Sequence, residues 1–355
     1  MTVELTSLAE LEPALEAEGF FGRADAVAHV YIGYGISDPL RRSGEPAPPE
    51  PCPLPTVAYA IESNPGARPG PGTRVSRRPA PAGAYSVGAW RASWSEGEYA
   101  AAVDVVRAAI AEGDVYQVNL VQHLCADFDG DPAGLARALA PLEPLEPRPF
   151  AGAGWAIVSA SPELLLSRRG RRISTSPIKG TRPAGVPVES AKDAAEHVMI
   201  VDLERNDLSR VAVPGSVHWP ELLVERQLAG VTHLVATVEA ELREDVTLTE
   251  LLEATLPGGS VTGCPKIAAL DLIAQLEPVG RGASMGALGR IYSNGDLELA
   301  LTIRTFAIAD GRIHLWVGGG IVWDSSPVDE VEESWVKARP LLEAIGAPLP
   351  ASSVA

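Results

Sequence analysis

Apolar and polar residues follow strand-like and helix-like patterns in turn along this chain. Apolar runs at residues 156–159 and 164–167 and around Ile173 are short and separated by Ser-Pro and Arg-Gly pairs, which is typical of strands joined by tight turns. A capping box at residues 95–98 instead precedes apolar residues at helical spacing, which stop at Gly113. The pattern therefore predicts a chain that mixes β-hairpins with amphipathic helices.

The remaining elements are predicted on the same grounds. The N-terminal part holds a short helix and two apolar strands among Pro/Gly-rich loops, and the last third is rich in strands and ends in a helix that starts at Pro327. In one strand, alternation puts Gln117 and Asn119 on the same face, which is either solvated or part of a site. The predicted strands lie at residues 27–36, 56–61, 115–120, 285–292, 298–308 and 312–317, and the predicted loops at residues 44–55 and 63–83.

Composition narrows the class of protein. A chain of 355 residues forms one large domain or two moderate ones, and 46% hydrophobic residues exclude a disordered chain. The net charge of −17 argues against nucleic acid and an anionic membrane as partners, so an anionic substrate needs a local basic pocket. No apolar stretch reaches the roughly 18 residues of a membrane helix, and the acidic N-terminus lacks a signal-peptide pattern. Three widely spaced cysteines complete the expectation of a reduced, cytoplasmic protein without disulfides or a zinc site.

Lys179 is the first candidate for chemistry. It follows a predicted strand and lies between Pro177, which restrains the backbone, and Gly180, which permits a close approach. In a cleft, burial and neighbouring cations would lower the pKa of its amine and make the amine a nucleophile. The alternative at this point is an ordinary loop lysine in water.

Acidic residues recur at one-turn spacing on two predicted helices. Asp193 and Glu196 share one side of the first helix with apolar residues, and Glu330 and Glu333 share one face of the last helix with Lys337. Carboxylates in such positions suit a buried divalent cation, or else they mark the boundary of an amphipathic helix.

A glycine-rich loop precedes a further helix, predicted at residues 267–275. The loop contains Thr262 and ends at Lys266, and the backbone amides of such a loop suit an anion. Cys264 has no histidine near it in the sequence and is expected to pack rather than react. Arg304 follows an apolar run, where an arginine needs an anionic partner or an exposed position.

Ten motifs in a fixed order give the chain a resemblance to a known family. A set of this length is far more specific than any single motif. Over about residues 95–342 the chain resembles the chorismate-utilising enzymes, and within them it is most similar to component I of the aminodeoxychorismate (para-aminobenzoate) synthases. The motifs are GDVYQVNL, SPELLL, PIKGTRPAG, AEHVMIVDLERNDLSRVAVPGSV, THLV, GGSVTGCPK, MGALGRI, IRT, GGGIV and the closing segment at residues 324–339.

The resemblance implies an α+β fold, in which two large antiparallel β-sheets pack as a sandwich with flanking helices, as in anthranilate synthase component I. Residues 1–94 are then a reduced N-terminal region that contributes to the same fold, and residues 95–355 form the chorismate-binding catalytic region. The N-terminal region shows no match to the tryptophan-binding motif usual in the family.

A site for chorismate and Mg²⁺ is implied as well. Glu196 and Glu333 match the metal ligands of the family, and Asp193 and Glu330 are expected to act on the metal directly or through water. The residues expected to hold the substrate are Gly180, Thr181, Thr262, Lys266, Arg304, Gly318, Gly319, Gly320 and Lys337.

The resemblance also implies roles in the chemistry. Lys179 matches the lysine with which aminodeoxychorismate synthases attack ring carbon 2, a position that is alanine in anthranilate and isochorismate synthases. Glu163 matches the acid that protonates the departing hydroxyl, and His233 matches a histidine at the reacting ring. Gln117 replaces the lysine with which isochorismate synthases activate water, so hydroxylation is disfavoured.

Ammonia is the implied second substrate. No glutaminase signature occurs in the sequence, so ammonia comes free or from a separate glutamine amidotransferase subunit. The alternatives are an anthranilate or aminodeoxyisochorismate synthase component I, which Lys179 disfavours, and a catalytically impaired, chorismate-binding regulatory subunit. Two residues depart from the family: Arg290 is expected near the pocket, and His123 is expected in the packing behind the Gln117 strand.

Overall fold

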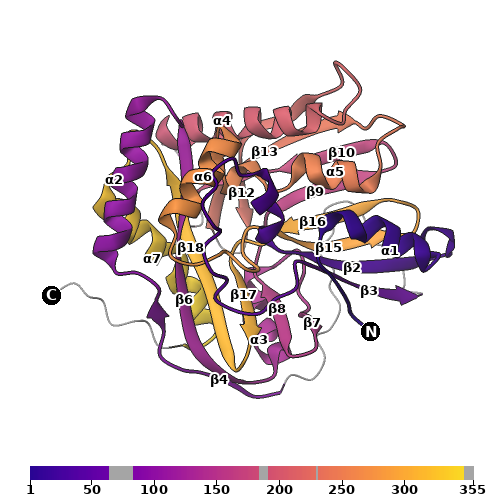
Figure 1. The fold of residues 1–355 in the computed structure, drawn as a ribbon, viewed down its shortest axis with the longest axis horizontal. Coiled ribbons are helices and arrows are strands. Elements are labelled where there is room, and N and C mark those ends of the chain that lie inside the picture. Colours follow the sequence, from indigo (N-terminus) through magenta and orange to yellow (C-terminus); the bar gives the residue numbers. More distant parts are fainter. Residues whose placement is uncertain (64–82, 184–190, 229–230, 348–355) are drawn as a thin grey trace.

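The structure is a computed structural model of residues 1–355, and it describes all of them except residues 64–82, 184–190, 229–230 and 348–355 (Figure 1). Within the described ranges, no helix is both long and apolar enough to cross a membrane.

The larger of two antiparallel sheets has ten strands in the described part of the chain. Their order is β1-β3-β2-β15-β16-β9-β10-β13-β11, and β12 also pairs with β13. The strands are β1 (Val3–Leu5), β2 (Ala26–Ile32), β3 (Val57–Ser63), β9 (Leu164–Arg169), β10 (Arg172–Ser176), β11 (Ile178–Pro183), β12 (His218–Leu228), β13 (Val231–Glu241), β15 (Ala287–Tyr292) and β16 (Leu297–Leu301).

The smaller sheet has eight described strands in the order β14-β6-β18-β17-β8-β7, and β4 and β5 also pair with β6. Its centre is the pairing of two long strands, β6 and β18, which runs from Val118 opposite Ile321 to Asp127 opposite Arg312. The strands are β4 (Tyr85–Val87), β5 (Arg91–Ala92), β6 (Gln117–Gly130), β7 (Phe150–Gly152), β8 (Trp155–Ser159), β14 (Gly263–Cys264), β17 (Thr305–Ala309) and β18 (Arg312–Ile321).

Helices pack around the two sheets, as Figure 1 shows. Three apolar clusters hold the layers together: one joins the two sheets, one lies under α3 and α7, and one joins α2 and α6 to β6. The α+β sandwich that the resemblance implied is confirmed. The helices are α1 (Leu11–Ala17), α2 (Glu96–Glu112), α3 (Pro132–Leu139), α4 (Ala191–Ser209), α5 (Leu248–Thr255), α6 (Lys266–Leu276) and α7 (Pro327–Ala344).

The first helix after the N-terminal region begins and ends where the sequence predicts. The Ser95 hydroxyl accepts a hydrogen bond from the Glu98 amide, and the Glu98 carboxylate accepts one from the Ser95 amide. Gly113 follows the helix in a left-handed conformation, with φ of 86°, as a helix-ending glycine does.

The first three strands, β1, β2 and β3, are part of the larger sheet. β2 pairs with β3 on one side and with β15 on the other, so residues from both ends of the chain meet there. The strand predicted at residues 27–36 ends as a strand at Ile32, because a 3₁₀ helix occupies Tyr34–Leu40. The predicted boundary at residue 94 stays a prediction.

The chain crosses between the sheets at two adjacent places. β8 of the smaller sheet leads through residues 160–163 to β9 of the larger sheet, and β16 of the larger sheet leads through residues 302–304 to β17 of the smaller one. The Ala160 amide donates to the Arg304 carbonyl (2.9 Å), and the Leu301 amide donates to the Glu163 carbonyl (3.0 Å). The two crossovers are thus bound to each other.

The second crossover corrects a sequence prediction. Residues 298–308 were expected to form one strand, but Arg304 has φ of 51°, which is incompatible with an extended strand. The apolar run therefore divides into β16 and β17, which belong to different sheets. Periodicity does not detect the break, because both halves are equally apolar.

Lys179 also lies differently from its predicted place. It is inside β11, where its backbone is opposite Leu234 of β13, rather than after a strand. Gly180 follows with φ of 61°, at a shift in the strand register. The proline and glycine that indicated the end of a strand instead flank an irregular edge strand.

Candidate active site

Lys179 is a half-buried lysine on β11. Burial lowers the pKa of its amine, and the Lys337 ammonium lowers it further. The carboxylates of Glu196, Glu163 and Glu333 act in the opposite direction. Lys179 therefore lies among three acids and a second lysine, with a net shift towards the neutral amine.

Glu163 is buried at the first crossover, and its Oε1 accepts a hydrogen bond from the Ser260 hydroxyl (2.8 Å). Burial raises the pKa of its carboxyl to about 7, against the lowering effects of the Ser260 hydrogen bond and of the Lys179 charge. A carboxyl group with this pKa holds a proton near neutral pH and can donate it, as a general acid must.

Arg304 is half-buried at the second crossover. Burial lowers the pKa of its guanidinium, and the Glu163 carboxylate raises it. In the described ranges, no carboxylate forms an ion pair with Arg304. Because a half-buried guanidinium needs an anionic partner or water, this geometry fits the predicted role of Arg304 in holding an anionic substrate.

His233 lies on β13 opposite the lysine strand and is almost fully buried. Its Nδ1 donates to the carbonyl oxygen of Gly180 (2.7 Å), which assigns the ring proton to Nδ1. Burial lowers the pKa of His233 to about 4, and the Arg304 charge adds to this. The neutral ring thus fixes the backbone next to Lys179.

The glycine triplet lies in β18 beneath α7. A Cβ on Gly319 would lie 3.2 Å from Oε2 of Glu330, 3.3 Å from Oε1 of Glu333 and 3.3 Å from Nζ of Lys337. Lys337 Nζ donates to Glu333 Oε1 (2.7 Å) and to the Gly318 carbonyl (2.8 Å). The acids and the lysine of the last helix therefore meet over one glycine, as their spacing predicted.

Gln117 is fully buried, so the predicted alternative of a solvated strand face is wrong. Its side chain lies over Gly320, where a Cβ would come within 2.3 Å of Gln117 Nε2. Neither its Oε1 nor its Nε2 has a hydrogen-bond partner in the described part of the chain. A buried amide without partners is costly, which fits a group that binds a ligand or water.

Some of the predicted metal ligands lie close enough together to suit a divalent cation. Glu330 and Glu333 approach the same point over Gly319, and Glu196 acts on the same lysine as Glu333 does. Carboxylates from two helices are a suitable ligand set for Mg²⁺, which also keeps water ligands. Among the described side chains, no three acids, histidines or cysteines already converge as a metal site. The side chains of Asp193 and Thr181 lie outside the described part, so their predicted roles stay predictions.

Thr262 and Lys266 have partners within the protein. The Thr262 hydroxyl donates to the Gly258 carbonyl (3.0 Å), while Lys266 Nζ donates to Asp207 (2.5 Å) and to the Pro257 carbonyl (2.8 Å). Both residues thus hold the glycine-rich loop in shape, and their expected contact with substrate stays a prediction.

Two residues near the site were missed from the sequence. Ser260 contacts Glu163 directly, and its place in a Gly-Gly-Ser loop was the available signal. His197 is fully buried on α4, and its two ring nitrogens have no hydrogen-bond partner in the described ranges. Burial lowers its pKa to about 4, and the Lys179 charge adds to this shift. Its position directly after Glu196 gave no signal, since neighbours in sequence point to different sides of a helix.

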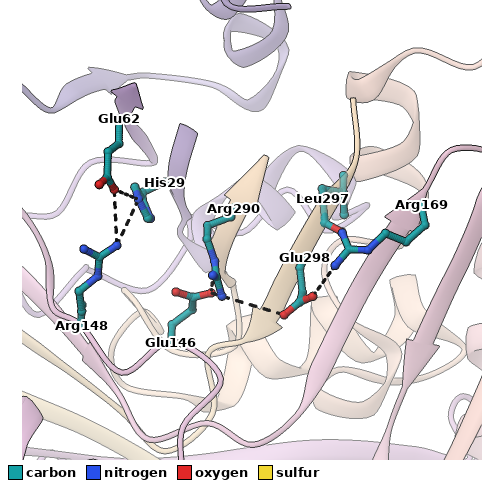
Figure 2. Close-up of polar contacts among 8 residues, drawn as sticks. All are labelled: His29, Glu62, Glu146, Arg148, Arg169, Arg290, Leu297 and Glu298. Carbon is teal, nitrogen blue, oxygen red and sulfur yellow. Dashed lines mark hydrogen bonds and ion pairs between the residues drawn. The ribbon is translucent and has the colours of Figure 1, made fainter. Parts of the chain in front are cut away.

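Arg290 lies in an ion-pair cluster on the larger sheet (Figure 2). Its guanidinium donates to Glu146 at 2.9 and 2.6 Å and lies 4.0 Å from Glu298, which also pairs with Arg169 at 2.8 Å. The side chain is 8% exposed, so these acids account for its charge. The expectation that Arg290 lies near the substrate pocket gains no support, because its contacts are to this cluster.

The other two notable side chains pack as expected. His123 is buried, stacks on His314 and lies against Trp316, so its predicted packing is confirmed, although it lies in the Gln117 strand, β6, and not behind it. Cys264 is a free thiol, and burial raises its pKa, which keeps it protonated and fits packing rather than nucleophilic attack.

The fold and the site define a class of protein: an α+β sandwich with a lysine, a protonatable acid and an arginine at the junction of its sheets. The chain belongs to the chorismate binding enzyme family, whose model matches residues 63–343. The resemblance found in the motifs is thereby confirmed.

Two curated relatives show how similar the chain is to named members. Anthranilate synthase component 1 of Thermus thermophilus is 43% identical over 256 residues, which cover 69% of this chain and 54% of that protein. Aminodeoxychorismate synthase component 1 of Escherichia coli is 39% identical over 269 residues, which cover 72% of this chain and 59% of that protein. The chain thus spans a little over half the length of these relatives.

Solved structures agree on the fold. The crystal structure of anthranilate synthase component I from Streptococcus pneumoniae matches with a TM-score of 0.73 and 25% identity, covering 88% of this chain and 80% of that one. A putative isochorismate synthase from Bacillus anthracis gives the same TM-score at 22% identity, covering 98% and 92% of the two chains. The second likeness shows the fold alone.

Proposed function

We propose that the chain is a component I that converts chorismate and ammonia to 4-amino-4-deoxychorismate through an adduct on Lys179. The observation that carries the proposal is a half-buried lysine with a lowered pKa, beside an acid whose pKa is raised to about 7. This pair supplies a nucleophile and a proton donor for replacing a hydroxyl group.

The proposed steps balance as follows. The neutral Lys179 amine forms a bond to ring carbon 2, both conjugated ring double bonds shift, and the hydroxyl at carbon 4 leaves as water with the proton of Glu163. Ammonia then forms a bond to carbon 4, and the bond between carbon 2 and Lys179 breaks to release the neutral amine. The new ammonium group returns a proton to Glu163, so both groups are ready for another turnover.

Other residues of the site bind and orient in this proposal. Arg304 and the backbone around Gly319 hold the two carboxylates of chorismate, and the neutral ring of His233 keeps the strand next to Lys179 in place. Glu196 and Glu333, with Asp193 and Glu330, would hold Mg²⁺, which supplies positive charge for a substrate carboxylate when bound. Ammonia would come free or from a separate glutamine amidotransferase subunit, and the setting would be the cytoplasm.

Anthranilate formation is the second candidate, because a relative of that name is 43% identical to the chain. The two reactions differ in the ring carbon that receives nitrogen. The test incubates the purified chain with chorismate, Mg²⁺ and ammonium and resolves the products by mass spectrometry, with and without a lyase that acts on 4-amino-4-deoxychorismate. A product that the lyase converts to para-aminobenzoate supports the proposal, whereas anthranilate overturns it.

A further inference from the structure

The buried side of α4 is bound to the glycine-rich loop by a carboxylate. Glu204 is 3% exposed, and its Oε1 accepts a hydrogen bond from the Gly259 amide (3.1 Å). Glu204 therefore binds the first amide of the Gly259–Ser260 turn, a geometry in which a carboxyl group fixes a loop.

A second contact from the same helix holds the start of the loop. Asp207, one turn after Glu204, pairs with Lys266, and Lys266 also donates to the carbonyl of Pro257 (2.8 Å). The loop is thus attached to α4 at Pro257 through Lys266 and at Gly259 through Glu204. Of the two attachments, only the one at Glu204 lies next to the loop residue that reaches the active site.

That loop residue is Ser260. Its hydroxyl donates to Glu163 Oε1 at 2.8 Å, while the amide of the preceding residue, Gly259, donates to Glu204 Oε1 at 3.1 Å. A Cβ on the adjacent Gly259 would lie 3.2 Å from Glu204 Oε1, so the helix carboxyl and the turn are in close contact. The position of the Ser260 hydroxyl, and with it the hydrogen bond to Glu163, depends on the contact with Glu204.

We propose that Glu204 is a positioning residue, which holds the Gly259–Ser260 turn so that the Ser260 hydroxyl binds the proton-donating carboxyl of Glu163. The inference rests on the proposed function of Glu163. It adds a residue on α4 that touches neither the substrate nor the reacting atoms, yet sets the protonation of the group that does.

The charges around both acids set the direction of the effect. Glu163 faces Lys179, Arg304 and Glu204, and Glu204 faces Asp207 and Lys266. The Ser260 hydrogen bond favours the ionised form of Glu163 and lowers its pKa. A charge on Glu204 disfavours that form, but burial raises the pKa of Glu204 itself to about 8, so this charge grows only as pH rises above neutral. A variant that removes both the charge of Glu204 and the oxygen that accepts from the Gly259 amide changes the pKa of Glu163 in two ways at once. A second variant must therefore remove the charge and keep the oxygen.

Glu204→Ala and Glu204→Gln form this pair, since both lack the charge and only glutamine keeps a carbonyl oxygen for the Gly259 amide. Protonation of Glu163 is measured without turnover, from the infrared band of a protonated carboxyl group that disappears in Glu163→Gln. We expect the midpoint of this band to lie about one pH unit higher in Glu204→Ala than in Glu204→Gln, the size of one hydrogen bond to a charged group. With Ser260→Ala added to each variant, the two midpoints should coincide.

Hydrogen exchange of the backbone amides provides a second, independent measurement of whether Glu204 holds the turn. Exchange in residues 256–264 should be faster in Glu204→Ala and unchanged in Glu204→Gln. Asp202→Asn is the matched control, because Asp202 is exposed on the same helix and pairs with Arg205. Equal midpoints in Glu204→Ala and Glu204→Gln, or a difference that persists without the Ser260 hydroxyl, would overturn the inference. Neither measurement needs turnover, so a failure of the proposed reaction is seen separately, in the product assay.

Discussion

Glu163 and Arg304 lie at the two adjacent crossovers between the sheets, and the backbone of each is hydrogen-bonded to the other crossover, through Leu301 and Ala160. The arrangement brings the carboxyl group of Glu163 and the guanidinium of Arg304 to the same junction. No ion pair forms between them in the described structure. Burial raises the pKa of Glu163 to about 7, and the Arg304 charge opposes this shift, while the Glu163 carboxylate raises the pKa of Arg304. Because burial outweighs the Arg304 charge, Glu163 holds a proton near neutral pH, and the guanidinium is the group proposed to bind an anionic ligand.

The first prediction concerns the pH dependence set by Glu163. A general acid works in its protonated form, and burial raises the pKa of Glu163 to about 7, so turnover should fall as pH rises through about 7. Glu163→Gln should lose about a hundredfold or more in kcat and lose this limb of the profile. Rates of chorismate consumption from pH 5 to 9 give the comparison, with exposed Glu253→Gln as the control. If Glu163→Gln had the pH profile of the wild type, Glu163 would not be the general acid.

The same raised pKa predicts a change in stability. Between the ordinary carboxyl pKa of 4.5 and the folded value of about 7, the folded chain binds more protons than the unfolded chain, so this carboxyl costs stability as pH rises. The Tm of Glu163→Gln minus the Tm of the wild type should therefore be larger at pH 8 than at pH 5. Thermal unfolding at the two pH values measures this difference without substrate. A difference in Tm that does not change with pH would show that Glu163 is not perturbed.

The second prediction separates the acids of α7. Glu333→Gln should weaken Mg²⁺ binding and lower turnover by about tenfold or more, since one charged ligand is lost. Glu332→Gln is the matched control, because Glu332 is adjacent in sequence and also exposed, but pairs with Arg339 instead of Lys337. Glu196→Gln on α4 should behave like Glu333→Gln. Binding of Mn²⁺, followed by its electron paramagnetic resonance signal, reports the site without turnover; unchanged binding in both variants would refute the metal assignment.

A third prediction uses the contact between Gln117 and Gly320. Gly320→Ala would place a methyl group 2.3 Å from Gln117 Nε2, the end of a side chain, so the fold should persist while the amide is displaced. Gly318→Ala would instead place the methyl 1.9 Å from the Leu120 carbonyl oxygen and should unfold or weaken the β6–β18 pairing. Gly35→Ala is the control, because nothing lies within 4 Å of a Cβ there. Gly320→Ala should thus lower chorismate affinity with little loss of Tm, whereas Gly318→Ala should lower Tm. An equal loss of Tm in the two variants would contradict this.

A fourth prediction concerns the source of nitrogen. In the described structure, no histidine hydrogen-bonds any of the three cysteines. Burial raises the pKa of Cys264, the cysteine in the glycine-rich loop. A glutaminase needs an activated nucleophile. The purified chain should therefore form product with ammonium and none with glutamine. Glutamine-dependent product from the isolated chain, free of other proteins, would mean that a glutaminase centre has been overlooked.

Local patterns predicted the elements well, and the crossovers show where they fail. The capping box at Ser95 and the acids of α7 depend only on neighbouring residues, so spacing was enough to place them. Arg304 could be marked as unusual from its apolar context, but its left-handed conformation depends on the meeting of two sheets. The partners of Ser260 and Lys266 lie 97 and 59 residues away in the chain, a separation at which periodicity carries no information.

The last prediction tests Lys179 itself. When chorismate and Mg²⁺ are supplied without ammonia, the second step cannot occur, so a covalent adduct should accumulate on Lys179 and show in the intact mass of the protein. Its rate should rise with pH towards about 7, because the reactive form is the neutral amine, and fall above it, because Glu163 then loses the proton that the departing hydroxyl needs. Burial lowers the pKa of the amine, so the rise should begin below the range of an ordinary lysine. Peptide mapping should place the adduct on Lys179 and not on Lys337, which is held by Glu333 and the Gly318 carbonyl. Ammonium should discharge the adduct to product, and Lys179→Ala should form none. If Lys179→Ala makes 4-amino-4-deoxychorismate at the wild-type rate, the lysine serves the structure of β11 and the proposed chemistry is wrong.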